Sequence, residues 1–388
     1  MKNIKMEYKY RLDKSMHHIL TWIRSLIWHK KRTQALNLQG AISIGVVYPH
    51  LIGDVVMATP FFRKLRQIAP HAKITFIGAS WAKQILCGQN LVDDFICFKN
   101  PRAMLGGRAF IDNWQDVLSV LKKARENEFD IVIEPFGNFV ANLFMSFLKA
   151  KQYVGIGFSN LSKLQTFTVP YDPAGHLIDG LMRVFETTGC PVQPQERIPK
   201  IILTEQQLQF GKEFIAEYQL QNKTIIGIHP GASVPSRRFL GFGQTINLLC
   251  RENPQIVICL FCGPGDDNFV QNILNQVEAG FQPRVLIVKR DMAQYMAILN
   301  ICTHVICNDS SCGHISAALG IPVTVLFAQG DPRFIAPRGE NTVNIISRDF
   351  PCKPCLLNEC PKHTHECFTW ITPEIVVQIV KKNLPERK

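Results

Sequence analysis

The sequence predicts an α/β protein built from two similar domains in tandem, each with a parallel sheet covered by helices on both faces. Apolar runs typical of buried strands alternate with amphipathic helical segments along both halves of the chain. The length of 388 residues suits two domains. With 46% hydrophobic and 19% charged residues, each half can bury a full core.

The first domain is predicted to span residues 41–200, after a separate N-terminal arm of residues 1–40. Its apolar periodicity indicates strands and helices in alternation. The predicted strands are 41–48, 72–80 and 129–135, and the predicted helices are 53–68, the region near 115–127, and 138–149.

The second domain is predicted to span residues 201–388. The two domains join near 190–204, where prolines and charges gather without apolar periodicity. Residues 304–333 indicate a strand, a polar turn, a short helix of small residues and a second strand. The other predicted strands are 223–231, 255–264 and 284–289, and the other predicted helices are 244–254, 268–277, 292–302 and 374–384.

Polar motifs follow the first strand of each domain, where ligands of parallel sheets bind. In the first domain, Gly53 and Asp54 open a helix, and Glu134 ends a later strand as a weaker candidate. Asp54 is open to two interpretations. It is a capping carboxylate behind a turn glycine, or a general base that accepts the proton of an attacking hydroxyl.

The second domain carries motifs suited to an anion. Its first strand ends in a Gly-rich turn with Ser233, followed by Arg237 and Arg238, and guanidinium groups bind phosphate bidentately. The sequence GPGDD follows the next strand, and an Asp there suits a ribose hydroxyl. No GxGxxG follows a first strand, which argues against a nicotinamide dehydrogenase.

The turn at residues 308–314 places hydroxyls, a glycine and a carboxylate at the start of a helix. Backbone N–H groups there lack intrahelical partners and the helix dipole is positive, so a phosphate or diphosphate fits. The alternative interpretation is an ordinary capped loop between a strand and a helix.

The N-terminal arm is strongly basic. The chain has a net charge of +12, and residues 1–40 contribute nine basic and two acidic side chains. Met16, Ile19, Leu20, Ile23 and Ile27 recur at helical spacing, with two tryptophans beside them. The apolar run is too short to span a bilayer and lacks a signal-peptide pattern. We therefore expect a helix on an anionic membrane surface, or one docked on its own domain.

The chain contains 13 cysteines, most of them in apolar runs where a free thiol behaves as a small hydrophobe. This usage predicts a reducing, cytoplasmic compartment. In the segment 352–367, Cys352, Cys355, Cys360 and Cys367 form a CxxC followed by two further cysteines, which predicts a structural zinc site. Unpaired thiols and two disulfides are the alternatives.

Four motifs together resemble a known family. GDVVMATP, HPGAS with SRRF, the GPGDD turn and NDSSCGHISAALGIPVTVLFAQGDPR occur in this order over about residues 41–345. They resemble glycosyltransferase family 9, the bacterial lipopolysaccharide heptosyltransferases. The resemblance implies the GT-B fold, in which two Rossmann-like doubly wound domains face an interdomain cleft. It also implies metal-independent, inverting transfer from ADP-heptose to the Kdo or heptose of the inner core, with no cofactor required.

The resemblance assigns roles by position. Asp54, after Gly53, matches the proposed base, and Asp309 matches the contact to the donor heptose. The other matches concern the donor nucleotide: Ser233, Arg237 and Arg238 near its diphosphate, Asp267 near its ribose, and Ser310, Ser311, Gly313 and His314 around the diphosphate. There are three departures from the usual pattern: Ser311 and Cys312 stand where Gly followed by Pro or Leu is common, Arg237 stands in place of a Lys, and Phe239 in place of a Trp.

The predicted enzyme is cytoplasmic and peripheral on the inner face of the cytoplasmic membrane, where its lipid-linked core acceptor lies. The first alternative is a GT-B transferase or epimerase that uses a different nucleotide sugar. The second is a basic nucleic-acid-binding protein. Against it, the positive charge clusters in the arm rather than along a domain groove, so we expect no nucleic-acid partner.

Overall fold

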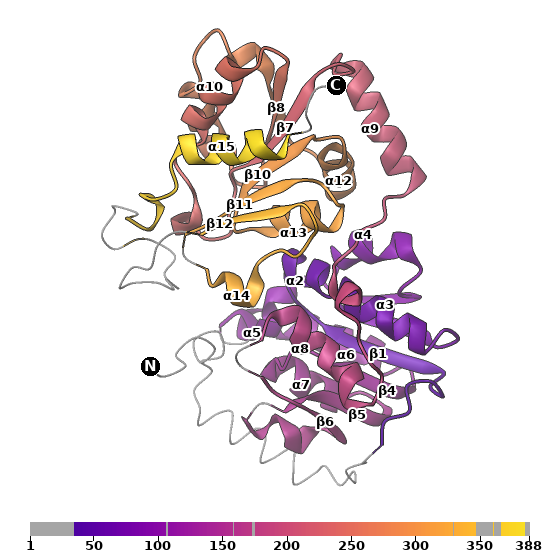
Figure 1. Ribbon diagram of the computed structural model, residues 1–388. Helices are drawn as coiled ribbons and strands as arrows, with labels where there is room; N and C mark the ends of the chain where they lie inside the picture. The colour runs from indigo at the N-terminus through magenta and orange to yellow at the C-terminus, as the bar shows by residue number, and fades with distance from the viewer. Residues whose placement is uncertain are drawn as a thin grey trace. The chain divides into compact units, whose positions relative to one another are not determined.

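The computed structural model describes residues 35–105, 108–157, 159–172, 175–328, 330–346, 360 and 366–384. It divides into two compact units, the first ending at Ile198 and the second beginning at Pro199 (Figure 1). This division falls inside the segment 190–204. Most of the basic arm and of the cysteine-rich tail lies outside the described residues.

The N-terminal unit contains a parallel sheet with the strand order β3-β2-β1-β4-β5-β6 among its described residues. Val46 of β1 pairs with Phe76 of β2 on one side and with Ile133 of β4 on the other. The order reverses between β1 and β4, which makes their carboxyl ends the switch point. The strands are β1 (Ser43–Tyr48), β2 (Lys73–Ala79), β3 (Asp94–Phe98), β4 (Phe129–Glu134), β5 (Ala150–Gly157) and β6 (Phe167–Pro170).

Helices cover both faces of this sheet. One face packs against α6 and α7 through a core that includes Val47 and Val132. On the other face, the ring of Phe62 on α3 lies against that of Phe76. The ring centroids of Phe61 and of Phe185 on α8 are 5.0 Å apart. The helices are α2 (Ile52–Met57), α3 (Thr59–Ile68), α4 (Ala82–Leu86), α5 (Arg108–Asp112), α6 (Trp114–Ala124), α7 (Phe139–Ser146) and α8 (Leu177–Thr187).

The C-terminal unit repeats the topology, with the described strands in the order β12-β11-β10-β7-β8-β9, all parallel. Its switch point lies between β7 and β10. The strands are β7 (Thr224–His229), β8 (Ile256–Phe261), β9 (Val285–Val288), β10 (His304–Asn308), β11 (Val323–Phe327) and β12 (Thr342–Ile346).

The second sheet is also covered on both faces. Helices α10, α11 and α15 pack on one face in a core that contains Ile228 and Leu260. On the opposite face, Phe261 contacts Tyr295 of α12. The helices are α9 (Glu205–Glu217), α10 (Phe242–Glu252), α11 (Asp267–Asn275), α12 (Met292–Asn300), α13 (Ser311–Ala318), α14 (Pro332–Ile335) and α15 (Pro373–Asn383).

The predicted α/β class with two doubly wound parallel sheets is confirmed, with one local correction. Residues 53–68 do not form one helix, because α2 ends at Met57 and α3 begins at Thr59. Pro60 lacks an N–H and its ring disfavours a continuous helix past the carbonyl of Val56. That carbonyl accepts a hydrogen bond from the Thr59 hydroxyl at 2.8 Å instead.

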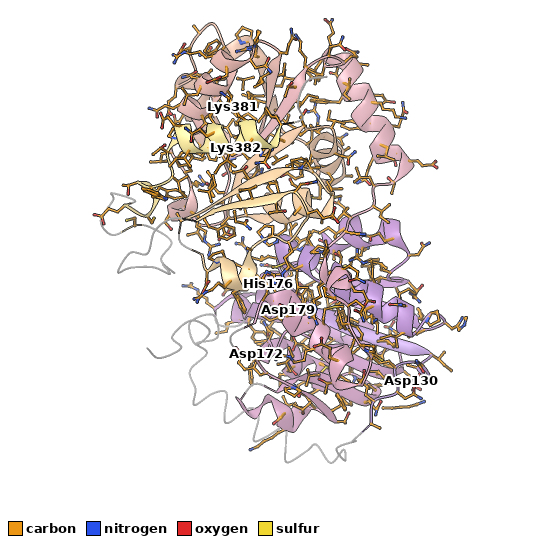
Figure 2. All side chains as sticks on the ribbon, viewed as in Figure 1. Asp130, Asp172, His176, Asp179, Lys381 and Lys382 are labelled. Atoms are coloured by element: carbon orange, nitrogen blue, oxygen red, sulfur yellow. The ribbon has the colours of Figure 1, made fainter. Side chains whose placement is uncertain are left out.

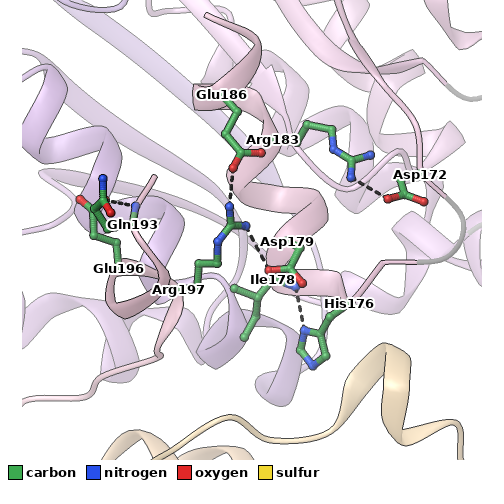
Figure 3. A network of polar contacts seen from close by, with 9 residues as sticks. All are labelled: Asp172, His176, Ile178, Asp179, Arg183, Glu186, Gln193, Glu196 and Arg197. Carbon is green, nitrogen blue, oxygen red and sulfur yellow. Dashed lines mark hydrogen bonds and ion pairs between the residues drawn. The ribbon is translucent and has the colours of Figure 1, made fainter. Parts of the chain in front are cut away.

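The segment before the domain boundary is tied to the N-terminal unit by ion pairs. Arg197 lies 3.0 Å from Asp179 and also pairs with Glu186, both on α8 (Figure 3). Arg63 donates to the carbonyl of Ile198. On the other side of the boundary, Ile201 donates its N–H to Ala318 within the C-terminal unit. The backbone is therefore fixed to its own unit at both ends of residues 199–200.

The amino ends of the N-terminal strands are closed by a structural carboxylate. Asp130, labelled in Figure 2, accepts the N–H groups of Ile42 and Ser43 at 2.7 and 3.1 Å and pairs with Lys151. The hydrogen bond from Lys151 and those N–H groups lower the pKa of Asp130. This Asp fixes backbone at the edge opposite the carboxyl ends of the strands.

The C-terminal core contains buried free thiols. Six cysteines of this unit are less than 9% exposed, whereas Cys97 and Cys190 of the N-terminal unit are half-buried. Cys259 lies within β8 and Cys262 directly follows its last residue, so this CxxC does not stand at the start of a helix. The buried thiols are Cys250, Cys259, Cys262, Cys302, Cys307 and Cys312.

Candidate active site

The end of β10 is held in place by a buried amide. The side chain of Asn308 donates to the carbonyl of Pro230 at 2.7 Å and accepts the N–H of Phe239 at 3.0 Å. It thereby fixes both ends of the loop that follows β7. In the sequence, Asn308 stands out only as part of a polar turn. A polar residue that closes an apolar strand was the signal that could have identified it.

Arg237 and Asp309 meet at the switch point of the C-terminal sheet. Arg237 ends the 3₁₀ helix η5 (Pro235–Arg237), and its Nη1 lies 3.3 Å from Oδ2 of Asp309. Asp309 is buried, whereas a quarter of the Arg237 side chain is exposed. The Nε of Arg237 is buried and has no hydrogen-bond partner among the described residues. The guanidinium therefore keeps donor capacity beside the start of α13.

Helix α13 begins directly after this ion pair. Its N-cap, Ser310, has extended backbone and makes no side-chain cap hydrogen bond. The Ser310 hydroxyl is buried, and within the described part of the chain it has no hydrogen-bond partner. A helix N-terminus, an unsatisfied hydroxyl and an arginine together favour binding of an anionic oxygen ligand.

Arg238 has a different environment from its neighbour. Its Nη2 lies 2.6 Å from Asp266 and 3.4 Å from the carbonyl of Ala232, and its guanidinium stacks on the ring of Phe269. Burial raises the pKa of Asp266, and the charge of Arg238 opposes that effect. Although the two arginines are adjacent, the contacts of Arg238 hold the loop to α11.

Two glycines allow the backbone to approach these carboxylates. A Cβ on Gly231 would lie 2.4 Å from Oδ2 of Asp266, and a Cβ on Gly330 would lie 2.6 Å from Oδ2 of Asp309. Neither contact is sterically possible without movement of the carboxylate. The strand-end loops are therefore packed closely around both acidic groups.

A pocket of about 610 Å³ lies at the carboxyl ends of β8 and β9. Its lining includes Cys262, Pro264, Lys289 and Asp291. Lys289 also forms an exposed ion pair with Asp267 at 2.5 Å, which lowers the pKa of Asp267. The predicted ribose contact therefore pairs with a residue that lines the pocket.

The remaining predicted donor residues occupy two environments. Ser233 is exposed in the loop after β7, and Ser311 is half-buried at the first position of α13. His314 is buried on α13. Gly313 faces the sheet, since a Cβ there would meet Val325 at 2.9 Å.

Asp54 lies at the switch point of the N-terminal sheet. It is the third residue of α2, after Gly53, and its Oδ2 accepts the N–H of Leu51 at 3.3 Å. The hydroxyl of Tyr48, at the end of β1, donates to the backbone carbonyl of Asp54 at 3.2 Å. Asp54 therefore makes the contact expected of a capping carboxylate. Its position after the carboxyl end of β1 is also the one that a general base requires.

Glu134, at the end of β4, is fully buried. Its oxygens accept the backbone N–H groups of Phe136, Gly137 and Asn138, and the side-chain amide of Asn142. Burial raises its pKa to about 8, although these four donors oppose the shift. Because its oxygens are occupied by neighbouring amides, Glu134 organises the loop between β4 and α7.

His229 ends β7, at the same strand-end edge of the C-terminal sheet as Asp309 and Asp266. Its Nδ1 lies 3.3 Å from the hydroxyl of Tyr295 on α12. Enclosure by protein lowers the pKa of His229 to about 4, so the imidazole is neutral at physiological pH. Sequence reasoning did not select this pair, because its members lie 66 positions apart in the chain.

The predicted zinc site lies largely outside the described residues. Cys352 and Cys355 fall there, while Cys360 and Cys367 are among the described residues and are half-buried. Among the described residues, no group of three or more His, Cys, Asp or Glu side chains is arranged to hold a metal ion. The zinc site stays a prediction that metal analysis of the purified protein would test.

Known proteins resemble the chain in sequence and structure. Lipopolysaccharide core heptosyltransferase OpsX of Haemophilus influenzae is 25% identical over 76% of this chain and 81% of its own length. Lipooligosaccharide heptosyltransferase 2 of Haemophilus ducreyi is 22% identical over 87% of this chain and 98% of its own. The family 9 glycosyltransferase of Veillonella parvula has a TM-score of 0.72 at 21% identity, covering 92% of this chain and 100% of that one. The structure of Escherichia coli ADP-heptose heptosyltransferase II has a TM-score of 0.69 at 18% identity, covering 88% of this chain and 98% of that one.

Two Rossmann-like parallel domains with this strand order define the GT-B class of glycosyltransferase folds. The model of glycosyltransferase family 9 (heptosyltransferase) matches residues 117–365, more than half of the chain. The chain belongs to this family and is a glycosyltransferase. Gly53 and Asp54 precede the matched residues, so their roles rest on the sequence motif and the strand-end geometry.

Proposed function

We propose that the enzyme transfers heptose from ADP-heptose to a Kdo or heptose residue of the lipopolysaccharide inner core, with inversion at the anomeric carbon and without a catalytic metal. The relatives that match most of the chain are named as lipopolysaccharide or lipooligosaccharide heptosyltransferases. Solved structures of the same fold include the Escherichia coli heptosyltransferase WaaC with ADP and with ADP-2-deoxy-2-fluoro heptose.

The observation that carries the proposal is the arrangement of Arg237, Ser310 and the N-terminus of α13. In it, the unsatisfied hydroxyl and Nε lie at the switch point, and the guanidinium is held by Asp309. A diphosphate placed there would accept hydrogen bonds from both and face the positive end of the helix dipole. Ser233, Ser311 and His314 complete the proposed diphosphate site.

The pocket beside Lys289 suits the nucleoside of the donor. Its volume of about 610 Å³ falls in the usual range for small-molecule sites. Asp267 would accept hydrogen bonds from the ribose hydroxyls. Arg238, held by Asp266 and Phe269, would support the loop rather than contact the phosphates.

The N-terminal domain would bind the acceptor and supply the base. The Asp54 carboxylate takes the proton of the acceptor hydroxyl, and the acceptor oxygen bonds to the anomeric carbon. The bond from that carbon to the diphosphate oxygen breaks, and its electron pair leaves with ADP. Arg237 and the α13 N-terminus stabilise the charge that grows on the leaving diphosphate.

The enzyme would work at the cytoplasmic face of the inner membrane, because its acceptor is a lipid. Within the described residues, no helix is both long and apolar enough to cross a bilayer. The basic residues of 1–40 would hold the protein to the anionic lipid surface, as a peripheral protein.

A transfer assay tests the proposal. Purified protein is incubated with ADP-heptose and either Kdo-lipid A or a heptose-bearing core, and the anomeric configuration of the product is determined. Inverted heptosylated product is expected from one acceptor. If every core acceptor stays unmodified and ADP-heptose gives no thermal shift, the donor assignment is wrong, and other ADP-, UDP- and GDP-sugars are screened. Interconversion of a nucleotide sugar without acceptor would indicate an epimerase.

A further inference from the structure

An exposed apolar surface lies on the two short helices between β3 and β4. Ile111 is 68% exposed, Leu118 51%, Trp114 50% and Phe110 37%. These four residues, on α5 and α6, are called the α5–α6 patch below. Another face of α6 packs into the core through Val117, Val120 and Ala124, so the patch is a separate surface and not a loosely packed part of the core.

We propose that the α5–α6 patch docks on the surface of an anionic lipid bilayer. This inference rests on the proposed function, since a lipid-linked acceptor brings the enzyme to a membrane. Aliphatic side chains beside a tryptophan, on short helices that lie on the protein surface, are the residue types that enter the boundary between headgroups and acyl chains.

Basic side chains flank the patch along the chain, and one of them, Arg108, pairs with Asp112 inside it at 3.8 Å. Arg102 and the highly exposed Arg108 precede it, and Lys122 and Lys123 follow it in the last turn of α6. Residues 99–128 carry six basic and four acidic residues, so the segment is positive overall. Each cation near an anionic surface strengthens binding by about fivefold, and long basic side chains keep their charge in the headgroup layer while apolar neighbours enter.

The place of the patch in the fold also favours a bilayer. Helix α5 comes after the carboxyl end of β3 in the chain, and α2, which carries Asp54, comes after the carboxyl end of β1 in the same parallel sheet. β3 is two strands from β1, or roughly 10 Å across the sheet. A bilayer that contacts the patch would therefore lie beside the edge that binds the acceptor sugar.

The size of the patch argues against a stable dimer interface. Four side chains at these exposures offer on the order of 400 Å² of apolar surface. A standard protein interface buries about 800 Å² on each partner. A bilayer needs no complementary protein shape, so a patch of this size suffices when cations flank it.

Vesicle flotation of the full chain tests the inference. The double variant Ile111→Ser/Trp114→Ser is compared with wild type on vesicles of phosphatidylethanolamine with phosphatidylglycerol, and on phosphatidylcholine alone. The matched control is Leu208→Ser/Trp370→Ser, which removes one exposed aliphatic and one exposed Trp from the C-terminal unit. We expect the patch variant to partition about tenfold more weakly onto the anionic vesicles and the control to bind like wild type.

Three results would overturn the inference. One is unchanged vesicle binding by the patch variant. Another is a loss of thermal stability in the patch variant that the control does not share, which would mean that the patch packs against protein. The third is a wild-type dimer that becomes monomeric in the patch variant, which would make the patch a contact between copies.

Activity separates this inference from the proposed function. With a water-soluble core oligosaccharide, the patch variant should transfer heptose at the wild-type rate, and with acceptor embedded in vesicles its apparent KM should rise. Vesicle binding through the patch without any heptose transfer would contradict the proposed function alone. Transfer with equal KM for both proteins on embedded acceptor would contradict the patch.

Discussion

The two domains share one topology but differ in what surrounds the carboxylates at their strand ends. In the C-terminal domain, Asp309 and Asp266 each pair with an arginine, at 3.3 and 2.6 Å. In the N-terminal domain, Glu134 accepts hydrogen bonds from uncharged amides, and Asp54 accepts one from a backbone N–H.

This difference separates two kinds of chemistry on one scaffold. Arginines fixed by carboxylates keep positive charge at an edge, which suits an anionic leaving group. In the proposed mechanism, the carboxylate of Asp54 at the start of α2 takes the proton of the acceptor hydroxyl. In the proposed mechanism, the same type of parallel sheet therefore holds the anion site in one domain and the proton acceptor in the other.

The largest effect is expected for Asp54→Asn. The amide preserves the cap acceptor but cannot take a proton, so kcat should fall by about 10²–10⁴-fold with the melting temperature unchanged. The matched control is Asp130→Asn, at the opposite edge of the same sheet. Equal turnover by Asp54→Asn and wild type would remove Asp54 from the mechanism.

The adjacent arginines should differ in their effect on catalysis, although each pairs with a buried carboxylate. Arg237→Ala should lower kcat by about 10²–10³-fold, since one charge-stabilising donor is lost. Arg238→Ala leaves the buried Asp266 without its cation and should cost about 1–3 kcal/mol of unfolding free energy. Turnover and urea unfolding of both variants check this, and the reverse pattern would exchange the two assignments.

Glu134→Gln tests the pH dependence of the N-terminal edge. The pKa of Glu134 is raised from 4.5 to about 8, so the folded state favours the protonated acid. Its stabilising contribution is complete below pH 4.5 and is lost as pH rises to about 8, a change of roughly 3–5 kcal/mol. Urea unfolding at several pH values should give a flatter profile for the variant, and parallel profiles would show that Glu134 does not titrate in this range.

The smallest effect is expected for Asp267→Asn. Its ion pair with Lys289 is exposed, so stability should not change measurably. If Asp267 binds the donor ribose, KM for ADP-heptose should rise several-fold at constant kcat, since such a contact is equal in ground and transition states. An unchanged KM would place the ribose elsewhere.

The alternation of strands and helices could be predicted from sequence wherever a strand is buried on both faces. The strands β1, β2, β4, β7, β8, β10 and β11 were found this way. Strand β9 was also predicted, although three of its four residues are not buried. Strands β3, β5, β6 and β12 were missed. β3 and β5 contain half-exposed positions, and β6 is only four residues long, so each gives a weak apolar signal.

Site residues could be predicted from sequence where the residue type itself indicates the chemistry. Which of two adjacent residues of the same type belongs to the site could not be predicted. The RR pair indicated a phosphate contact, yet the ion pair of Arg238 with Asp266 spans 28 positions and depends on the packing of β8 against β7. Asn308 acts through two backbone groups that lie 69 and 78 positions away. Such contacts exist only once the sheet has formed.

Cys250 and Cys307, two buried thiols of the C-terminal core, give the protein a built-in reporter of its own opening. Burial raises the pKa of Cys250 and Cys307, so these sulfurs stay protonated and unreactive while the domain is closed. A thiol-reactive dye therefore labels them only at the rate at which the core exposes them. A donor nucleotide sugar that binds only the closed domain would slow this labelling by mass action. The rate of alkylation then measures the affinity for the nucleotide sugar without an acceptor and without turnover.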